Sequence, residues 1–205
     1  MPNIKFAIFD VGQTIYPFTL SPLNDLMQKQ TKDKNIFKNH HTAFDYDYNP
    51  YMKGFLTHNE FALNLCQFCN VDYHDNIPAQ INLALHQGQG KPFEKTLKAM
   101  QIFQSFGIEI GILSNALPAL SDSKIPFAKP QYIFTSYELG LLKPDIKIYQ
   151  ALAEHLHTPY EQILFIDDKE RNITAAHSLG IHGIVYNQAT ILQEITAYLP
   201  EKPLR

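Results

Sequence analysis

Five short apolar runs constrain the fold of this chain most strongly, and they span residues 4–10, 107–114, 131–136, 162–168 and 181–186. Runs of this length, bounded by polar and turn-forming residues, predict buried strands. Apolar residues at helical spacing lie between several of them, over residues 92–106, 144–156 and 172–179. Strands that alternate with helices predict an α/β fold, a doubly wound parallel sheet with helices on both faces.

The stretch from residue 17 to residue 90 interrupts this alternation. It is rich in Asn, His, Tyr, Gln and Lys, and it contains no strong strand run. Thr57 and Glu60 have the spacing of a helix capping box, and apolar residues at helical spacing follow them. We therefore expect a helical cap at residues 17–90, inserted into a core formed by residues 1–16 and 91–205.

The composition is that of an ordinary globular protein, with 45% hydrophobic and 18% charged residues. The net charge is −3 and the sequence pI is about 6.3, which argues against a broad basic surface and a nucleic-acid partner. The longest apolar runs are much shorter than a membrane helix requires, and the N-terminus lacks a signal-peptide pattern. We expect a cytoplasmic protein without a membrane partner, either a monomer or a homodimer.

Cys66 and Cys69 form a CxxC spacing inside a helical pattern. No second cysteine pair or suitably spaced histidine pair accompanies them, so a structural role is favoured over zinc binding or redox chemistry. We also expect the tyrosines at positions 46, 48 and 51 to pack inside the cap, and the pair His40–His41 to be polar surface.

Polar side chains are concentrated where the predicted strands end, which is where open α/β sheets bind ligands. They are Asp10, Thr14, Ser114, Asn115, Asp167 and Asp168, and Lys143 precedes the helix before the fourth strand. Three carboxylates would repel one another unless a cation joined them, and oxygen ligands with several waters suit Mg²⁺. A hydroxyl, an ammonium group and loop N–H groups can hold a phosphate, which a carboxylate can attack. This set predicts Mg²⁺-assisted phosphoryl transfer to an aspartate, followed by hydrolysis.

The order and spacing of four segments resemble the haloacid dehalogenase-like superfamily. The segments are FDVGQT at 9–14, LSN at 113–115, LKP at 142–144 and FIDD at 165–168. The insertion lies where that family has its small helical cap, and residues 54–61 (GFLTHNEF) resemble a recurring cap sequence. The resemblance covers nearly the whole chain.

This resemblance implies a role for each matching residue. Asp10 would be the nucleophile and a metal ligand, the backbone carbonyl of Gly12 a second metal contact, and Asp167 and Asp168 the acidic metal ligands. Lys143 would steady the nucleophile and the phosphate. Thr14, Ser114 and Asn115 would contact the substrate, a small phosphorylated metabolite such as a sugar phosphate.

The chain departs from the phosphatase pattern after the nucleophile, because Gly12 and Gln13 stand where the family has aspartate and glycine. The missing aspartate would protonate the leaving oxygen and later activate water, and such acid–base catalysis is worth roughly 10²- to 10⁴-fold. A phosphatase with good leaving groups, such as anomeric sugar phosphates or acyl phosphates, is one interpretation. A water molecule or a cap residue could also supply the proton. A ligand-binding or partner-binding protein with little turnover is another interpretation.

A different reaction on the same fold is the third interpretation. Haloacid dehalogenation needs neither a metal nor a second aspartate, but the paired acids Asp167 and Asp168 argue against it. Cleavage of a phosphonate would need a Schiff-base lysine in the cap, for which Lys53 is a candidate only by its location.

Overall fold

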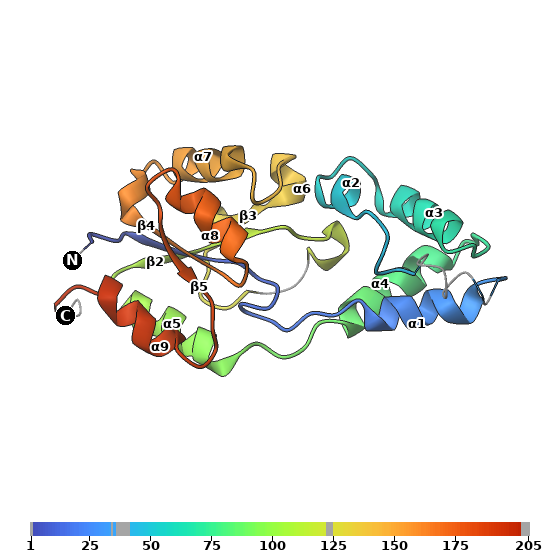
Figure 1. Ribbon diagram of the computed structural model, residues 1–205, viewed down its shortest axis with the longest axis horizontal. Coiled ribbons are helices and arrows are strands. Elements are labelled where there is room, and N and C mark those ends of the chain that lie inside the picture. The colour runs from blue at the N-terminus through green and yellow to red at the C-terminus, as the bar shows by residue number, and fades with distance from the viewer. Residues whose placement is uncertain (1, 34, 36–41, 122–124, 202–205) are drawn as a thin grey trace.

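The structure is a computed structural model that describes residues 2–33, 35, 42–121 and 125–201. Its centre is a parallel sheet in the order β3-β2-β1-β4-β5, so that β1 occupies the middle (Figure 1). The strands are β1 (Phe6–Phe9), β2 (Glu109–Ser114), β3 (Ile133–Thr135), β4 (Ile163–Asp167) and β5 (His182–Val185). All five lie within the apolar runs, and the predicted α/β fold is confirmed.

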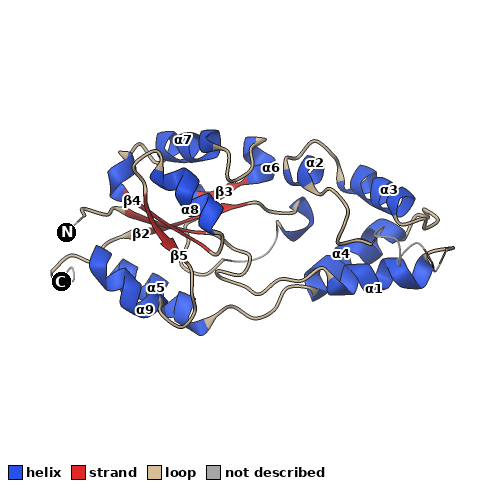
Figure 2. Cartoon of the chain, viewed as in Figure 1, coloured by secondary structure: helices blue, strands red, loops and turns tan. Residues whose placement is uncertain are grey.

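Helices cover both faces of the sheet, as Figure 2 shows. One face packs against α5 (Glu94–Ser105) and α9 (Ile191–Glu194), whose apolar residues share a buried cluster with the strands. The other face packs against α7 (Ile146–His155) and α8 (Glu170–His177) around a second cluster. The short helix α6 (Ser136–Leu139) follows β3, and 3₁₀ turns occupy Pro118–Leu120, Pro130–Tyr132, Tyr160–Gln162 and Ile195–Tyr198.

Strand register brings the acidic strand ends together. In the parallel pairing, Phe9 on β1 lies beside Ile166 on β4. The next residue on each strand is an aspartate, Asp10 and Asp167. Because neighbouring strands run about 4.8 Å apart, this register alone places the two carboxylates side by side.

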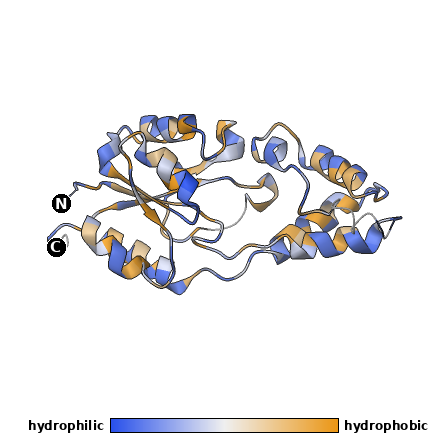
Figure 3. Ribbon diagram, in the orientation of Figure 1, coloured by the Kyte–Doolittle hydropathy of each residue, from blue (hydrophilic) through white to orange (hydrophobic). Residues whose placement is uncertain are grey.

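In the described part of residues 17–90, the regular elements are helices, which loops connect. It forms α1 (Ser21–Gln30), α2 (Asn49–Met52), α3 (His58–Phe68) and α4 (Ile77–Gln87), which lie beyond the ends of β1 and β2 (Figure 1). The expected capping box is present: the Thr57 side chain accepts from the Glu60 N–H, and the Glu60 carboxylate accepts from the Thr57 N–H. These helices enclose their own buried cluster. Figure 3 shows apolar residues concentrated on the strands and alternating with polar ones on the helices.

Aromatic packing accounts for the cap tyrosines. Tyr51 is fully buried, and its ring stacks on Phe61 with 4.1 Å between centroids. Tyr46 and Tyr48 meet edge to face and also contact Phe61. Packing inside the cap is thus confirmed for these tyrosines, whereas His40–His41 lies outside the described residues.

Two chain segments connect the cap to the core, and they run side by side. The Thr19 N–H donates to the Gly88 carbonyl and the Gly90 N–H donates to the Pro17 carbonyl, both at 2.9 Å. A Cβ on Gly88 would lie 2.0 Å from the Thr19 carbonyl oxygen, so the close approach requires glycine there. On the basis of this pairing, we propose that the cap begins near residue 17 and ends near residue 90. In the described part of the chain, we find no helix of the length and apolarity that crossing a membrane demands.

Candidate active site

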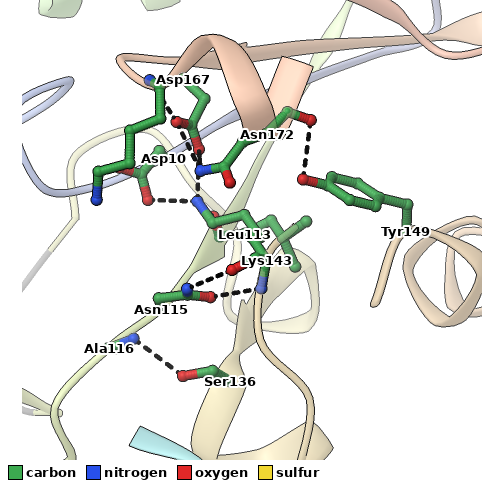
Figure 4. A network of polar contacts seen from close by, with 10 residues as sticks. Asp10, Leu113, Asn115, Ala116, Ser136, Lys143, Tyr149, Asp167 and Asn172 are labelled. Carbon is green, nitrogen blue, oxygen red and sulfur yellow. Dashed lines mark hydrogen bonds and ion pairs between the residues drawn. The ribbon is translucent and has the colours of Figure 1, made fainter. Parts of the chain in front are cut away.

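A buried lysine joins the two aspartates at the carboxyl ends of β1 and β4. Lys143 Nζ lies 2.6 Å from Asp10 Oδ1 and 2.7 Å from Asp167 Oδ2, and it donates to the Leu113 carbonyl at 2.8 Å (Figure 4). Lys143 is 4% exposed, Asp10 is 7% exposed and Asp167 is 0% exposed. Water therefore screens the interaction between these charged side chains only weakly. Lys143 contacts one aspartate 133 positions away in the sequence and another 24 positions away.

Asp168 completes an acidic cluster with these two aspartates. One carboxylate oxygen from each of Asp10, Asp167 and Asp168 lies within 4.8 Å of the others. Burial raises the pKa of Asp10 and of Asp168, because desolvation disfavours a charged carboxylate. Among the described residues, Asp168 Oδ1 is buried without a hydrogen-bond partner.

The donor set fits a divalent cation. Three carboxylates and one ammonium group leave two negative charges in a buried site, which one divalent ion would balance. Oxygen donors of this kind suit Mg²⁺, and Asp168 Oδ1 supplies an oxygen that no protein group occupies. Asp10, Asp167 and Asp168 are thus the residues that could hold it. Whether the Gly12 carbonyl is a further ligand stays a prediction.

Asn172 is part of this network, although sequence reasoning missed it. Its side-chain amide donates to both oxygens of Asp167 at 2.9 Å, and it is 3% exposed on α8. The Tyr149 hydroxyl donates to the Asn172 carbonyl at 2.9 Å (Figure 4). The available signal was the position of Asn172, five residues after Asp167 and on the first turns of the following helix.

Asn115 positions the lysine. Its side chain donates to the Lys143 carbonyl at 3.0 Å and accepts from the Lys143 N–H at 2.9 Å. Both polar atoms of the amide are therefore used on the backbone of Lys143. The geometry indicates a positioning role, and direct contact of Asn115 with a substrate stays a prediction.

Of the remaining predicted contacts, Thr14 lies four residues after Asp10 and Ser114 lies on β2, the strand beside β1. Thr14 is fully buried, and among the described residues its Oγ1 has no hydrogen-bond partner. Ser114 ends β2 and is 6% exposed, and it lines the same cavity as Gly12. A Cβ on Gly12 would meet no atom within 4 Å, so there is open space at the position where the family pattern has an aspartate side chain.

The two cysteines lie apart from this site. Cys66 and Cys69 are free and fully buried in the cap cluster. Burial raises the pKa of the Cys66 thiol to about 11 and that of Cys69 to about 12. A protonated, buried thiol is a poor nucleophile and metal ligand, in agreement with the predicted structural role.

The fold and the site together define an α/β protein whose parallel sheet carries a buried lysine and an acidic cluster at its carboxyl edge. The family model for haloacid dehalogenase-like hydrolases matches residues 4–180, and the chain belongs to this family. The resemblance seen in the sequence is thereby confirmed.

Relatives of known activity differ in how much of their length they share with this chain. A sesquiterpene phosphatase of Aspergillus oryzae is 24% identical over 190 residues, which is 89% of each protein. Acyl-CoA dehydrogenase family member 10 of Mus musculus is 26% identical over 155 residues, or 73% of this chain, and drimenol cyclase drtB of Aspergillus calidoustus is 33% identical over 61 residues. The match spans only 14% and 12% of the length of these last two proteins.

Solved structures share the fold. A predicted HAD-like family hydrolase from Porphyromonas gingivalis has a TM-score of 0.75 and 19% identity, covering 98% of this chain and 100% of that one. HAD family enzyme bt-2542 of Bacteroides thetaiotaomicron, in complex with magnesium and inorganic phosphate, has a TM-score of 0.71 and 20% identity, covering 90% and 95%. At these identities the similarity concerns the fold.

Proposed function

We propose that this protein is a Mg²⁺-dependent phosphatase that hydrolyses a small phosphorylated metabolite through an aspartyl-phosphate on Asp10. One observation carries the proposal: Lys143 bridges Asp10 and Asp167 inside a buried cluster that still has an excess of two negative charges. The phosphatase from Aspergillus oryzae and the magnesium and phosphate complex of bt-2542 support it.

The reaction takes place in two steps. The Asp10 carboxylate attacks phosphorus, the bond from phosphorus to the ester oxygen breaks, and the alcohol leaves. Gly12 has no side chain to donate a proton, so the leaving oxygen takes its proton from water. A second water then hydrolyses the acyl phosphate, which releases inorganic phosphate and restores the carboxylate.

The residues around Asp10 hold the reacting groups in place. Lys143 fixes the orientation of the Asp10 carboxylate and places positive charge where the phosphate oxygens arrive. The hydroxyls of Ser114 and Thr14 are available to hydrogen-bond that phosphate. When bound, Mg²⁺ supplies the additional positive charge that brings two anions, carboxylate and phosphate, together.

The variant Asp10→Asn tests the covalent mechanism. With acetyl phosphate, p-nitrophenyl phosphate and a set of sugar phosphates as substrates, we expect wild-type turnover with Mg²⁺ and none with a chelator. Asp10→Asn should lose activity by at least about 10³-fold, because the amide cannot act as the nucleophile. Lys147→Ala, an exposed residue on α7, is the control and should keep wild-type activity. Wild-type activity in Asp10→Asn would reject the aspartyl-phosphate.

Gly12 favours a second candidate, a protein that binds a phosphorylated ligand with little turnover. Mg²⁺-dependent turnover of any substrate in the set above would exclude it.

Dehalogenation is tested separately by halide release from a 2-haloacid in the presence of a chelator. The family also contains such enzymes, and (S)-2-haloacid dehalogenase of Pseudomonas fluorescens is 26% identical to this chain over 94 residues, which is 43% of it. The acidic cluster argues against that reaction here.

The cytoplasmic location and the choice between monomer and homodimer stay predictions. The free state of both cysteines agrees with a reducing compartment.

A further inference from the structure

A cavity of about 320 Å³ opens directly beside the nucleophile loop. Gly12 and Ser114 line one end of it, so a phosphate at Asp10 would direct its ester group towards this space. The open space at the Cβ position of Gly12 makes the approach unobstructed. The volume lies at the lower end of the range for small-molecule sites.

Apolar side chains from two directions form most of the cavity wall, and polar side chains such as Gln89, Asn115 and Ser121 form the rest. The core contributes Tyr16, Ile112, Ile125 and Ile133, which belong to or pack against the buried cluster on the α5 face. The cap-side cluster contributes Phe18, Leu117 and Leu120. A group in this cavity would thus be held between the sheet and side chains that belong to or pack against the cap cluster, with hydrocarbon on both sides.

The charges of the described residues that line the cavity disfavour an anion. Among the described residues that line it, Glu138 is the only carboxylate, and none is Lys, Arg or His. Thr135 donates its hydroxyl to Glu138 at 2.6 Å, which fixes the carboxylate at the cavity wall. The cationic side chains Lys53 and Arg171 line a different pocket, which Lys143 and Pro144 also line.

These observations restrict the leaving group of the substrate. A second phosphate or a carboxylate on that group would lose its hydration in an apolar cavity, beside a like charge and without a described cation. An uncharged hydrocarbon group would instead gain from burial, by about 0.8 kcal/mol for each methylene.

We propose that the substrate is the phosphate monoester of an uncharged, hydrocarbon-rich alcohol, whose body fills this cavity. The inference rests on the proposed phosphatase function and names the substrate class for that site. The products are the free alcohol and inorganic phosphate. Glu138 acts as a specificity-determining residue, because its charge excludes alcohols that carry a further anion.

A homologous series of n-alkyl phosphates, from ethyl to decyl, tests the proposal. Primary alkyl alcohols have nearly the same pKa, so the series varies the buried area and leaves the chemistry unchanged. We expect kcat/KM to rise about fourfold with each methylene until the cavity is full. An ester of equal length with a terminal carboxylate should be hydrolysed at least about tenfold less efficiently. A flat series, or preference for the carboxylate, would overturn the proposal.

Two pairs of variants locate the effect. Leu120→Asn should flatten the dependence on chain length, whereas Leu83→Asn, on an exposed cap position, should leave it as in the wild type. Glu138→Lys should favour the carboxylate-bearing ester over the neutral one, and Glu138→Gln should give an intermediate ratio. If Glu138→Lys leaves this ratio unchanged, Glu138 does not determine specificity.

Binding of n-alkyl phosphonates separates the two proposals, because phosphonates bind without being hydrolysed. Calorimetry should show affinity rising with chain length for the wild-type protein in Mg²⁺. Rising affinity without turnover of any phosphate ester would overturn the phosphatase function and leave the ligand class intact. Turnover of acetyl phosphate with flat phosphonate affinities would overturn the substrate class alone.

Discussion

Gln13 adopts a backbone conformation that glycine normally provides. Its φ is 59°, in the left-handed region, at the position where the family pattern has glycine. Two hydrogen bonds offset the conformational strain: the Gln13 N–H donates to the Tyr16 carbonyl and its side-chain amide donates to the Phe18 carbonyl, both at 2.7 Å. The Gln13 side chain thus supports the loop that leads from the nucleophile into the cap.

Gly12→Asp restores the carboxylate that the phosphatase pattern contains. No atom lies within 4 Å of the Cβ position and the φ of Gly12 is not left-handed, so the loop can accept the side chain. We expect kcat for an alkyl phosphate to rise by up to roughly 10²-fold, because a general acid would protonate the leaving oxygen. Steady-state kinetics with Gly12→Asn as the size-matched control checks this. An equal rise in both variants would contradict the acid–base explanation.

Asn172→Ala removes the amide that orients Asp167. We expect the affinity for Mg²⁺ to fall about 10- to 100-fold, as is typical when a group that hydrogen-bonds a metal ligand is removed. A Mg²⁺ titration followed by calorimetry measures it. Asn82→Ala on α4 is the control, since Asn82 lies in the cap, away from the acidic cluster. Unchanged affinity in Asn172→Ala would show that Asp167 is positioned without it.

At the scale of elements, the strands were predictable and several helices were not. The central strands β1 and β4 are buried along their whole length and are apolar up to the aspartates at their carboxyl ends, because helices cover both faces of the sheet. The cap helices α1, α2 and α4 have Pro in their first turn and only four to eleven residues, so their periodicity is weak. Among the described cap helices, only α3 has a capping box as its start signal.

The candidate site was predictable in its members that follow strands, and less so in those that depend on side-chain direction. Asp10 and Asp167 lie side by side because each directly follows the last apolar residue of its strand, and these two apolar residues are paired in register. Asn172 and the amide of Asn115 act through the rotation of a helix and the path of a loop. The spacing of five residues places Asn172 near the start of α8, but the directions of the Asn172 and Asn115 side chains result from packing.

Gly88→Ala tests the paired connection between cap and core. The new methyl group would lie 2.0 Å from the Thr19 carbonyl oxygen, which neither backbone can avoid without shifting. We expect a loss of about 1–3 kcal/mol in the free energy of unfolding, measured by urea denaturation. Gly12→Ala carries the same chemical change where the Cβ meets no atom within 4 Å, and its stability should stay near that of the wild type. Equal effects in the two variants would contradict the steric explanation.

For the whole molecule, two buried thiols and a buried tyrosine hydroxyl in the cap predict that the free energy of unfolding falls at alkaline pH. Burial raises the pKa of Cys66 from 9.0 to about 11, of Cys69 from 9.0 to about 12, and of Tyr51 from 10.0 to about 12. The folded state keeps these protons while the unfolded state releases them. The corresponding stability is therefore full below about pH 9 and is lost as the pH rises towards 11 and 12.

Denaturation at a series of pH values measures this effect. The free energy of unfolding should be nearly constant from pH 7 to 8 and should fall between pH 9 and 11. The double variant Cys66→Ala/Cys69→Ala should start from a lower stability and show a smaller fall, because two of the titrating groups are absent. Identical falls in the variant and the wild type would exclude the thiols as a cause.

The paired connection has a consequence for how such a protein can diversify. With the proposed boundaries, the chain leaves the core after Tyr16 and returns at Lys91 through two paired segments, and no strand of the sheet lies among the described residues between them. The cap can therefore be exchanged for another insertion, in evolution or by design, while the order of the strands stays the same. The acidic cluster would stay unchanged in such an exchange, whereas the cavity would lose only the part of its wall that comes from the cap, Phe18 and Gln89.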